Sequence, residues 1–514
     1  MLKIPAAAHR SPAARSLSLA LALAAVAALP LAAQSSGSAR QSGANTNQSS
    51  GASSAGNQTA IAAGQTQLYN ATGANGALVT QDSFKGSLVS GVNSGQVLDL
   101  TLDDAITRGL RQNLGIILQS SATQNSNGER LEQLQQLLPT VTASATYSVE
   151  QVNLAAFGLK FPGINPIIGP FQVVDFRAYL TQNVINIAAL QSYLASKHNF
   201  AATKLTAEDA RDMVVLTVGN AYLLCIADQA RIDSVNAELK TSKLSFDQAT
   251  AAHDAGTSPR LDVLRAQVDY QNEQQTLIST TNQLAKDKIA LARAIGLPLD
   301  QQFRLVDNAP YKALDSLDPD AAFTQAINTR KDLKASAEQL QAAYSQRKAA
   351  LADRYPTASI TGDFGDLGTT VGHSHGTYTA TGTIEVPVLQ IAKNRGDKQV
   401  ADAVVAQSQA RLSDQAQQVN ADLRSAILDI QSAAKLVDTT RSNVGLATEE
   451  LSEAQSRFHA GVSDNLPVSQ AQTTLEQAND QYISALYQHN VAKLSLARAL
   501  GVAQTNYKDY LGGK

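Results

Sequence analysis

The sequence repeats one thirteen-residue stretch, and this duplication constrains the fold more than any other feature. The first copy, A-G-T-S-P-R-L-D-V-L-R-A-Q, occupies residues 255–267, and the second, A-G-V-S-D-N-L-P-V-S-Q-A-Q, occupies residues 460–472. Each copy places a glycine within an otherwise helical pattern, and regular heptads continue after it. A repeat at this distance indicates one structural unit that is used twice in the chain.

Apolar residues recur at seven-residue spacing on both sides of each glycine. Before the glycines, the two lines are Val218, Cys225, Ile232, Leu239 and Phe246, and Leu423, Ile430, Val437, Val444 and Leu451. After the glycines, they are Val263, Tyr270, Leu277, Leu284 and Leu291, and Val468, Leu475, Tyr482, His489 and Leu496. Sustained seven-residue spacing predicts paired helices that supercoil to the left. The first long helix, predicted over residues 188–253, would be roughly 100 Å long, which suits a tube better than a compact domain.

Two shorter segments in each half predict strands instead of helices. From Val141 to Val149, apolar residues alternate with Thr and Ser, so a strand there would have one apolar face and one polar face. The other predicted strands cover residues 171–184, 357–365 and 378–388. Loops join the strands in pairs, and the first loop is longer by about a dozen residues, which places both loops at exposed tips.

The amino-terminal residues predict export from the cytoplasm. Basic residues precede an apolar run at residues 17–29 and small residues follow it, which is typical of a signal peptide, predicted here over residues 1–33. Residues 34–97 are rich in Ser, Gly, Ala, Asn and Gln and contain few large apolar groups, so we expect a flexible arm. After the signal peptide, no segment approaches the ~20 apolar residues of a membrane-spanning helix.

Two strand pairs from one chain cannot close a barrel, and open strand edges are not tolerated in lipid. The sequence therefore predicts a mainly α fold in which several chains contribute strands to one small membrane β-barrel. Residues 98–310 and 311–502 would form two helix–hairpin–helix repeats, and residues 503–514 would form a C-terminal tail. An exported chain with barrel strands and no apolar helix indicates a bacterial outer membrane.

Composition and motifs argue against several classes of function. The net charge is −3, so no overall basic field recruits nucleic acid. Cys225 is the only cysteine, which excludes internal disulfides and multi-cysteine metal sites. His373 and His375 lie in one loop without a nearby third ligand, so we assign no metal site there. No nucleophile elbow, phosphate-binding glycine loop or paired acid and base is present, and we expect neither an enzyme nor a cofactor.

Several motifs and their order resemble the TolC-type outer membrane efflux family. They are L-T-L-D-D-A-I, L-P-T-V-T-A-S-A-T-Y, the glycine stretch and L-A-R-A-I-G-L-P, and the last two recur in the second half. The resemblance covers about residues 98–502. It implies a homotrimer with a twelve-stranded barrel that continues as a periplasmic α-helical coiled-coil tunnel. It also implies an outer-membrane exit duct that docks to a periplasmic adaptor and an inner-membrane transporter, in a tripartite efflux or type I secretion system.

The resemblance also places the two glycine breaks at the periplasmic tips of helical hairpins, where adaptors dock. Carried over position by position, the adaptor-contact candidates are Ala255, Gly256, Thr257, Ala460, Gly461 and Val462. Alternatively, each glycine only turns the chain at a helix C-terminus, and the two roles are compatible.

A second set of tip residues concerns the periplasmic aperture. Many family members narrow the tunnel with carboxylates one or two turns after the second glycine, but here Pro467 and Gln470 occupy that stretch. Asp464 lies just before it, and Asp262 is the acidic residue of the first copy. In a threefold ring, either aspartate would place three carboxylates around a pore and favour cations. The alternative for both is a solvated charge at the tip.

Two functions fit these features. The first is a passive exit duct in the outer membrane, and the second is an envelope coiled-coil protein with a structural or adhesive role and no channel activity. The strand pairs occur at matching positions between helices in both halves, which favours the channel. Because specificity in such a system usually resides in the pump, no substrate class is predicted.

Overall fold

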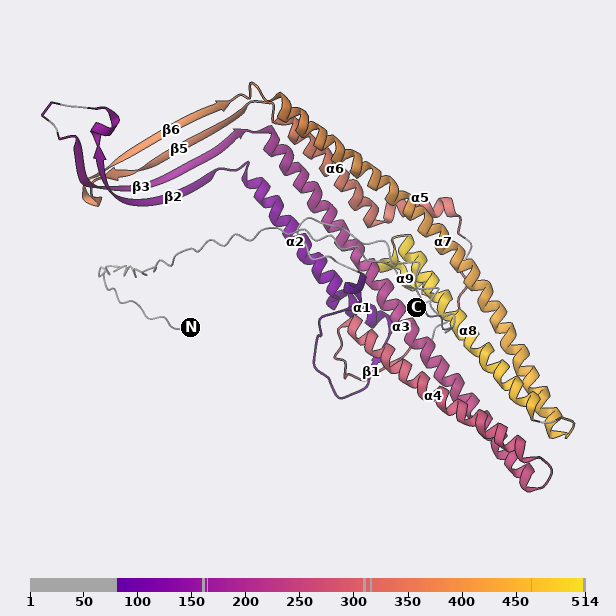
Figure 1. The fold of residues 1–514 in the computed structure, drawn as a ribbon. Helices are drawn as coiled ribbons and strands as arrows, with labels where there is room; N and C mark the ends of the chain where they lie inside the picture. The colour runs from indigo at the N-terminus through magenta and orange to yellow at the C-terminus, as the bar shows by residue number, and fades with distance from the viewer. Residues whose placement is uncertain are drawn as a thin grey trace, which may run out of the picture. The chain divides into compact units, whose positions relative to one another are not determined.

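The computed structural model describes residues 81–159, 162–163, 165–307, 311–314, 317–463 and 465–511. All of them belong to one compact unit, Gln67–Lys514. The predicted signal peptide and residues 34–80 of the predicted arm lie outside the described residues. Figure 1 shows a small sheet whose strands lead into long helices, and these helices return as antiparallel pairs.

The described chain is mostly helical, as predicted. Its α-helices are α1 (Leu102–Gln112), α2 (Leu114–Gln135), α3 (Ile187–Asp254), α4 (Arg260–Ile295), α5 (Pro319–Thr329), α6 (Lys331–Ala352), α7 (Ile391–His459), α8 (Leu466–Ala499) and α9 (Ala503–Leu511). Its strands are β1 (Leu98–Leu100), β2 (Thr140–Asn153), β3 (Ile167–Ile185), β4 (Phe303–Leu305), β5 (Thr357–Gly368) and β6 (Ser374–Glu385). Three short 3₁₀ turns are η1 (Gln81–Lys85), η2 (Leu154–Phe157) and η3 (Val371–His373).

The helices that precede the strand pairs are each interrupted once. Residues 101–138 have a single helical pattern in the sequence, but the backbone becomes extended at Asn113, between α1 and α2. The Asn113 side chain accepts a hydrogen bond from Gly115 N (2.9 Å) and thereby caps α2. In the second half, Arg330 is extended in the same way between α5 and α6. The interruption therefore belongs to the repeated unit.

Four strands form one antiparallel sheet in the order β2-β3-β5-β6. The pairing of β3 with β5 joins the two repeats, and β2 and β6 lie at the edges of the sheet. The register places the apolar residues of neighbouring strands side by side, for example Val141 opposite Leu180 and Phe364 opposite Tyr378. The predicted alternation is confirmed, although β3 begins at Ile167, four residues earlier than expected.

The long helices follow directly from the strands and pair as the heptads predicted. α3 is 68 residues long and α7 is 69, and each turns back through a glycine into α4 or α8. The heptad positions meet across the first pair, where the rings of Phe246 and Tyr270 stack with centroids 6.3 Å apart. On α8, small residues at seven-residue spacing are all buried and allow close helix approach: Ala471, Ala478, Ala485, Ala492 and Ala499.

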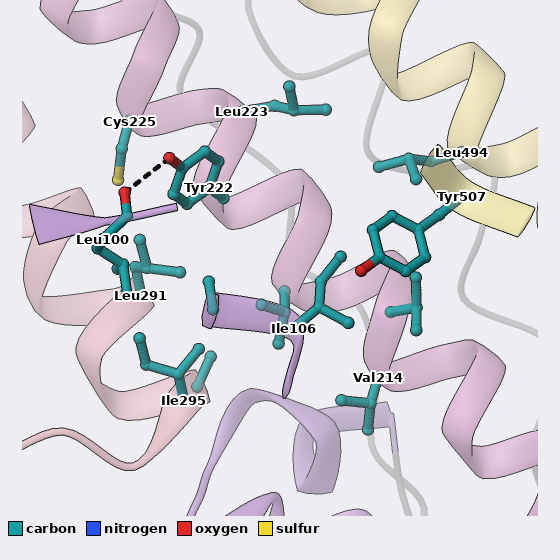
Figure 2. Close-up of a cluster of buried hydrophobic side chains, with 14 of the residues drawn as sticks. Leu100, Ile106, Val214, Tyr222, Leu223, Cys225, Leu291, Ile295, Leu494 and Tyr507 are labelled. Carbon is teal, nitrogen blue, oxygen red and sulfur yellow. Dashed lines mark hydrogen bonds between the residues drawn. The ribbon is translucent and has the colours of Figure 1, made fainter. Parts of the chain in front are cut away.

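The largest apolar cluster lies where α1, α3, α4, α8 and α9 meet the parallel pair β1–β4. Figure 2 shows its members, which include Leu100, Ile106, Val214, Tyr222 and Leu494. Cys225 is also a member and is fully buried, as its place in the apolar heptad line predicted.

Both ends of the described chain contribute to this core. The predicted C-terminal tail contains α9, which buries Ala503, Tyr507 and Leu511. At the other end, the last part of the predicted arm packs as well, because Phe84 in η1 is buried against Gly115. Packed structure therefore starts before Leu98, while the remainder of the arm stays a prediction.

Contrary to the expectation from the sequence, one described helix, α3, is long and apolar enough to cross a membrane by length and composition, with a window of mean hydropathy 1.4. Half of this window is buried inside the protein. The apolar residues of α3 include Val214, Val218 and Tyr222 of the main core. The same helix also buries Asp209 and Asp212. Core packing accounts for the apolar composition of this helix.

The Tyr222 hydroxyl provides a test of the core. It donates a hydrogen bond to Leu100 O (2.9 Å) and lies equally close to Asp307 Oδ2. We expect Tyr222→Phe to lower the free energy of unfolding by about 1 kcal/mol, because a buried acceptor loses its donor. Denaturant unfolding of the purified protein measures this. Tyr344→Phe, at an exposed position of α6, is the control and should leave stability unchanged.

Candidate functional site

The first candidate site is the turn between α3 and α4. Gly256 follows the helix end with φ 75°, a left-handed conformation that glycine adopts without strain. Its N–H donates to His253 O (2.8 Å), and Thr257 N donates to Ala252 O (2.9 Å). These two bonds form a Schellman motif, which satisfies the last carbonyls of α3.

The turn between α7 and α8 repeats this geometry. Gly461 has φ 69°, its N–H donates to Phe458 O (3.0 Å), and Val462 N donates to Arg457 O (3.0 Å). A Cβ added at either glycine would meet nothing within 4 Å, so both glycines face open space. The six adaptor-contact candidates are all exposed. In both turns the glycine adopts the left-handed conformation without strain, and its surroundings leave room for a partner.

The aperture candidates differ between the two turns. Asp262 is only 4% exposed and accepts a hydrogen bond from Ser258 Oγ (2.8 Å), so its carboxylate is held within its own turn. The matching position in the second repeat is Pro467, which is exposed in the first turn of α8, as is Gln470 one turn later. Asp464 lies outside the described residues. In this arrangement the second turn offers the more accessible side chains.

A polar network links the two helical hairpins within one chain. Arg231 on α3 donates to Asp480 Oδ1 (2.7 Å) and Ser484 Oγ (2.9 Å) on α8, and to Asp228 Oδ1 (3.2 Å) on its own helix. Burial, followed by the neighbouring Asp287, raises the pKa of Asp228 to about 6. The hairpins are therefore held to each other partly by charge-assisted bonds, which are stronger than neutral ones.

Three glutamates from three helices meet nearer the turns. The carboxylate oxygens of Glu238 on α3, Glu273 on α4 and Glu476 on α8 lie within 4.8 Å of one another. Burial, followed by the charges of Glu476 and Glu238, raises the pKa of Glu273 to about 7. Sequence analysis missed this acidic trio, because its members share no repeat position and converge only through the packing of distant helices.

The strands supply the second candidate surface. Their apolar face is exposed in the single chain and includes Val141, Tyr147, Phe364, Tyr378 and Ile384. The opposite face is polar, and there Arg177 on β3 contacts Asp175 (3.2 Å), Thr377 Oγ1 on β6 (3.2 Å) and Asp363 on β5. An exposed apolar sheet face backed by a hydrogen-bonded polar face is typical of a barrel wall between lipid and water.

Among the described residues, neither of the two histidines near the β5–β6 connection belongs to a cluster of potential metal ligands. His373 Nδ1 lies 3.0 Å from Thr370 Oγ1 in the η3 turn, and His375 is in β6. Among the residues that the structure describes, the acidic trio alone groups potential metal ligands, and neither histidine belongs to it.

The acidic trio makes stability depend on pH. Because the folded-state pKa of Glu273 is raised above the ordinary 4.5, the protein loses stability as pH rises from 4.5 through about 7. We expect Glu273→Gln to raise the stability at pH 8 by ~1 kcal/mol, allowing for solvent screening, and to change little at pH 4.5. Thermal unfolding at the two pH values measures this. Glu449→Gln, exposed on α7, should have no pH-dependent effect.

Two outer membrane proteins of Pseudomonas are similar to this chain in sequence. SepC of Pseudomonas putida, named a probable efflux pump outer membrane protein, is 27% identical over 332 residues, which is 61% of this chain and 64% of SepC. OprJ of Pseudomonas aeruginosa, named an outer membrane protein, is 24% identical over 321 residues, 61% of this chain and 65% of OprJ. The matches thus span less than two thirds of these relatives.

Solved structures share the fold. The MtrE outer membrane channel of Neisseria gonorrhoeae, in its open state, matches with a TM-score of 0.68 at 18% identity, over 81% of this chain and 94% of MtrE. The outer membrane protein VceC of Vibrio cholerae matches with a TM-score of 0.69 at 17% identity, over 78% of this chain and 96% of VceC. The family model for outer membrane efflux proteins matches residues 133–297 and 322–502, most of the described chain. The chain therefore belongs to the outer membrane efflux protein family.

Proposed function

We propose that this chain is the outer-membrane exit duct of a tripartite efflux or type I secretion system. One observation carries the proposal: a sheet with an exposed apolar face and a polar face continues, in the same chain, into paired helices of 68 and 69 residues. Such helices extend roughly 100 Å, far beyond the ~30 Å hydrocarbon core that the strands would cross. This combination suits a conduit that starts in the membrane and reaches into the periplasm.

The free edges of the sheet support a trimer. β2 and β6 lie at the two edges of the four-stranded sheet, and each has one side without a strand partner among the described residues. In lipid these backbone groups must be paired, and a closed barrel is the arrangement that pairs them all. If β6 of each copy paired with β2 of the next, three copies would form a twelve-stranded barrel. The apolar face would then point toward outer-membrane lipid and the Arg177 face toward the lumen.

The two exposed glycine turns support docking to a periplasmic adaptor and, through it, to an inner-membrane transporter. Both turns are open, lie at the far ends of the helices from the sheet, and occur once per repeat (Figure 1). In a trimer they would form six similar contact points. The duct itself is passive, and the partner transporter supplies energy and cargo choice.

Single-channel recording tests the conduit. We expect the detergent-extracted protein to run as a heat-modifiable trimer and to conduct ions in planar bilayers. A monomeric or non-conducting rod would contradict the proposal and support the structural or adhesive alternative. In the same recordings, Asp464→Asn should reduce cation preference if three such carboxylates line the aperture. Unchanged preference would remove Asp464 from that role, and Asp262→Asn should have little effect because Asp262 is buried.

Substitution of the turn glycines tests docking. Asparagine tolerates the left-handed conformation, and its side chain would project into open space. We therefore expect Gly256→Asn and Gly461→Asn to preserve the trimer and its conductance but to reduce export about tenfold or more in cells that contain the partner pump, corresponding to ~1.4 kcal/mol of lost docking.

The matched control for these variants is Gly158→Asn. Gly158 also has φ 75° and nothing within 4 Å of an added Cβ, but it follows the four-residue turn η2 rather than a long helix. Export should be unchanged in this variant. Normal export by the Gly256 and Gly461 variants would show that the two glycines serve the turn alone.

A further inference from the structure

Helix α8 buries two basic side chains that find no hydrogen-bond partner among the described residues. His489 and Lys493 lie one helical turn apart and are both 0% exposed. In the part of the chain that the structure describes, neither ring nitrogen of His489 nor Nζ of Lys493 has a partner. A buried cation without a partner is costly, so protonation of either side chain destabilises the packing around it.

The repeat shows that this arrangement is specific to the second half. The counterpart of Lys493, 205 positions earlier, is Lys288 on α4, whose Nζ donates to Phe303 O (3.3 Å) and lies 5.7 Å from the Phe303 ring centroid. Phe303 belongs to β4, which follows α4, whereas α8 is followed by the helix α9. The second repeat thus keeps the lysine but lacks the strand carbonyl that satisfies it. The counterpart of His489 is the apolar Leu284.

Residues 311–314, here called the strap, lie over this site. The Tyr311 ring contacts His489, with centroids 5.0 Å apart and planes inclined by 48°. Leu314 packs against the apolar cluster that α7 and α8 share, which includes Leu423 and Leu496. Lys312, between them, adds a third basic group near Lys493. The strap is therefore held by one aromatic contact with a titratable ring and by one apolar anchor.

We propose that the strap is an acid-sensitive cover of α8, released when His489 gains a proton beside the buried Lys493. Releasing the strap would hydrate both groups and relieve their mutual repulsion. The proposal does not depend on the channel function, since it concerns only packing within one chain.

Among the described residues, the charged groups around the site leave this repulsion largely uncompensated. On α7, the negative charge of Asp438 raises the pKa of His489. Burial and the positive charge of Lys493 lower this pKa by more. On α3, Asp209 is paired with Arg498 (2.9 Å) and Asp212 accepts from Gln504 N (2.7 Å), so both acids are already engaged. On the strap, Lys312 adds positive charge.

The pKa values set the direction and the pH windows. Burial, and then Lys493, lowers the pKa of His489 from 6.5 to about 4. Burial, and then Lys312, lowers the pKa of Lys493 from 10.5 to about 8. The covered state therefore binds fewer protons than the released state between pH 10.5 and 8, and again between pH 6.5 and 4. Acidification favours release within each window. Between pH 8 and 6.5, the ratio of released to covered protein does not change with pH.

Nitroxide mobility on the strap tests the proposal. Ala313→Cys on the full-length protein places a label at an exposed strap position, whereas Cys225 is buried and takes no label. From pH 9.5 to 4.5 we expect the mobile fraction to rise down to pH 8, stay level to pH 6.5, and rise again below it. Each step would change the mobile-to-immobile ratio by up to about a hundredfold. Circular dichroism should show constant helix content throughout.

Variants assign the two steps. His489→Leu, the residue of the first repeat, should remove the acid step and keep the alkaline one. Lys493→Met should remove the alkaline step and shrink the acid step, because the pKa of His489 in the covered state would rise toward 6.5. Lys312→Gln, an exposed change that leaves the core intact, should shrink the alkaline step. Lys288→Met is the matched control and should leave both steps unchanged.

Two outcomes would overturn the proposal. One is label mobility in the Ala313→Cys protein that does not change between pH 6.5 and 4.5. The other is an acid step that persists in His489→Leu or that Lys288→Met abolishes. Because the first outcome needs no core substitution, the proposal remains testable even if a core variant fails to fold.

Discussion

Backbone hydrogen bonding of the strands is the constraint on which the other features depend. Each repeat contributes one strand pair, and the pairing of β3 with β5 unites the two pairs in a single sheet with β2 and β6 at its edges. A sheet of this width can neither close alone nor leave its edges open in lipid. The proposed neighbouring copies, the proposed threefold arrangement and the proposed conduit are all argued from these two edges.

The helices extend this constraint away from the sheet. α3 starts directly after β3 and α7 starts shortly after β6, so the number of strand pairs sets the number of long helices that would enter the proposed tunnel. Their seams use heptad apolar residues and a line of alanines on α8, whereas the contacts between the hairpins use Arg231 and the acidic trio. Apolar seams thus hold each hairpin together, and charged side chains add contacts between the two hairpins.

Much of the fold could be predicted from spacing alone. Seven-residue and two-residue periods are local properties, and they located the long helices and the strands to within a few residues. The spacing fails where individual side chains decide the local structure. Asn113 caps α2 and ends α1. Tyr507 and Phe84 pack into the core and anchor the segments that were predicted as the tail and as the end of the arm. Composition described those last segments as polar without showing that a few apolar groups fasten them to the core.

The sequence by itself determined the duplication, the glycine turns, the strand faces and the family, because each depends on residues close together in the chain or on a repeated order of motifs. Only the tertiary structure decided the environment of the charged groups. Asp262 is held within its own turn, Glu238, Glu273 and Glu476 converge from three helices, and Lys493 is buried without the carbonyl that its counterpart Lys288 has. Burial and charge proximity arise from segments that are distant in sequence, and no local period encodes them.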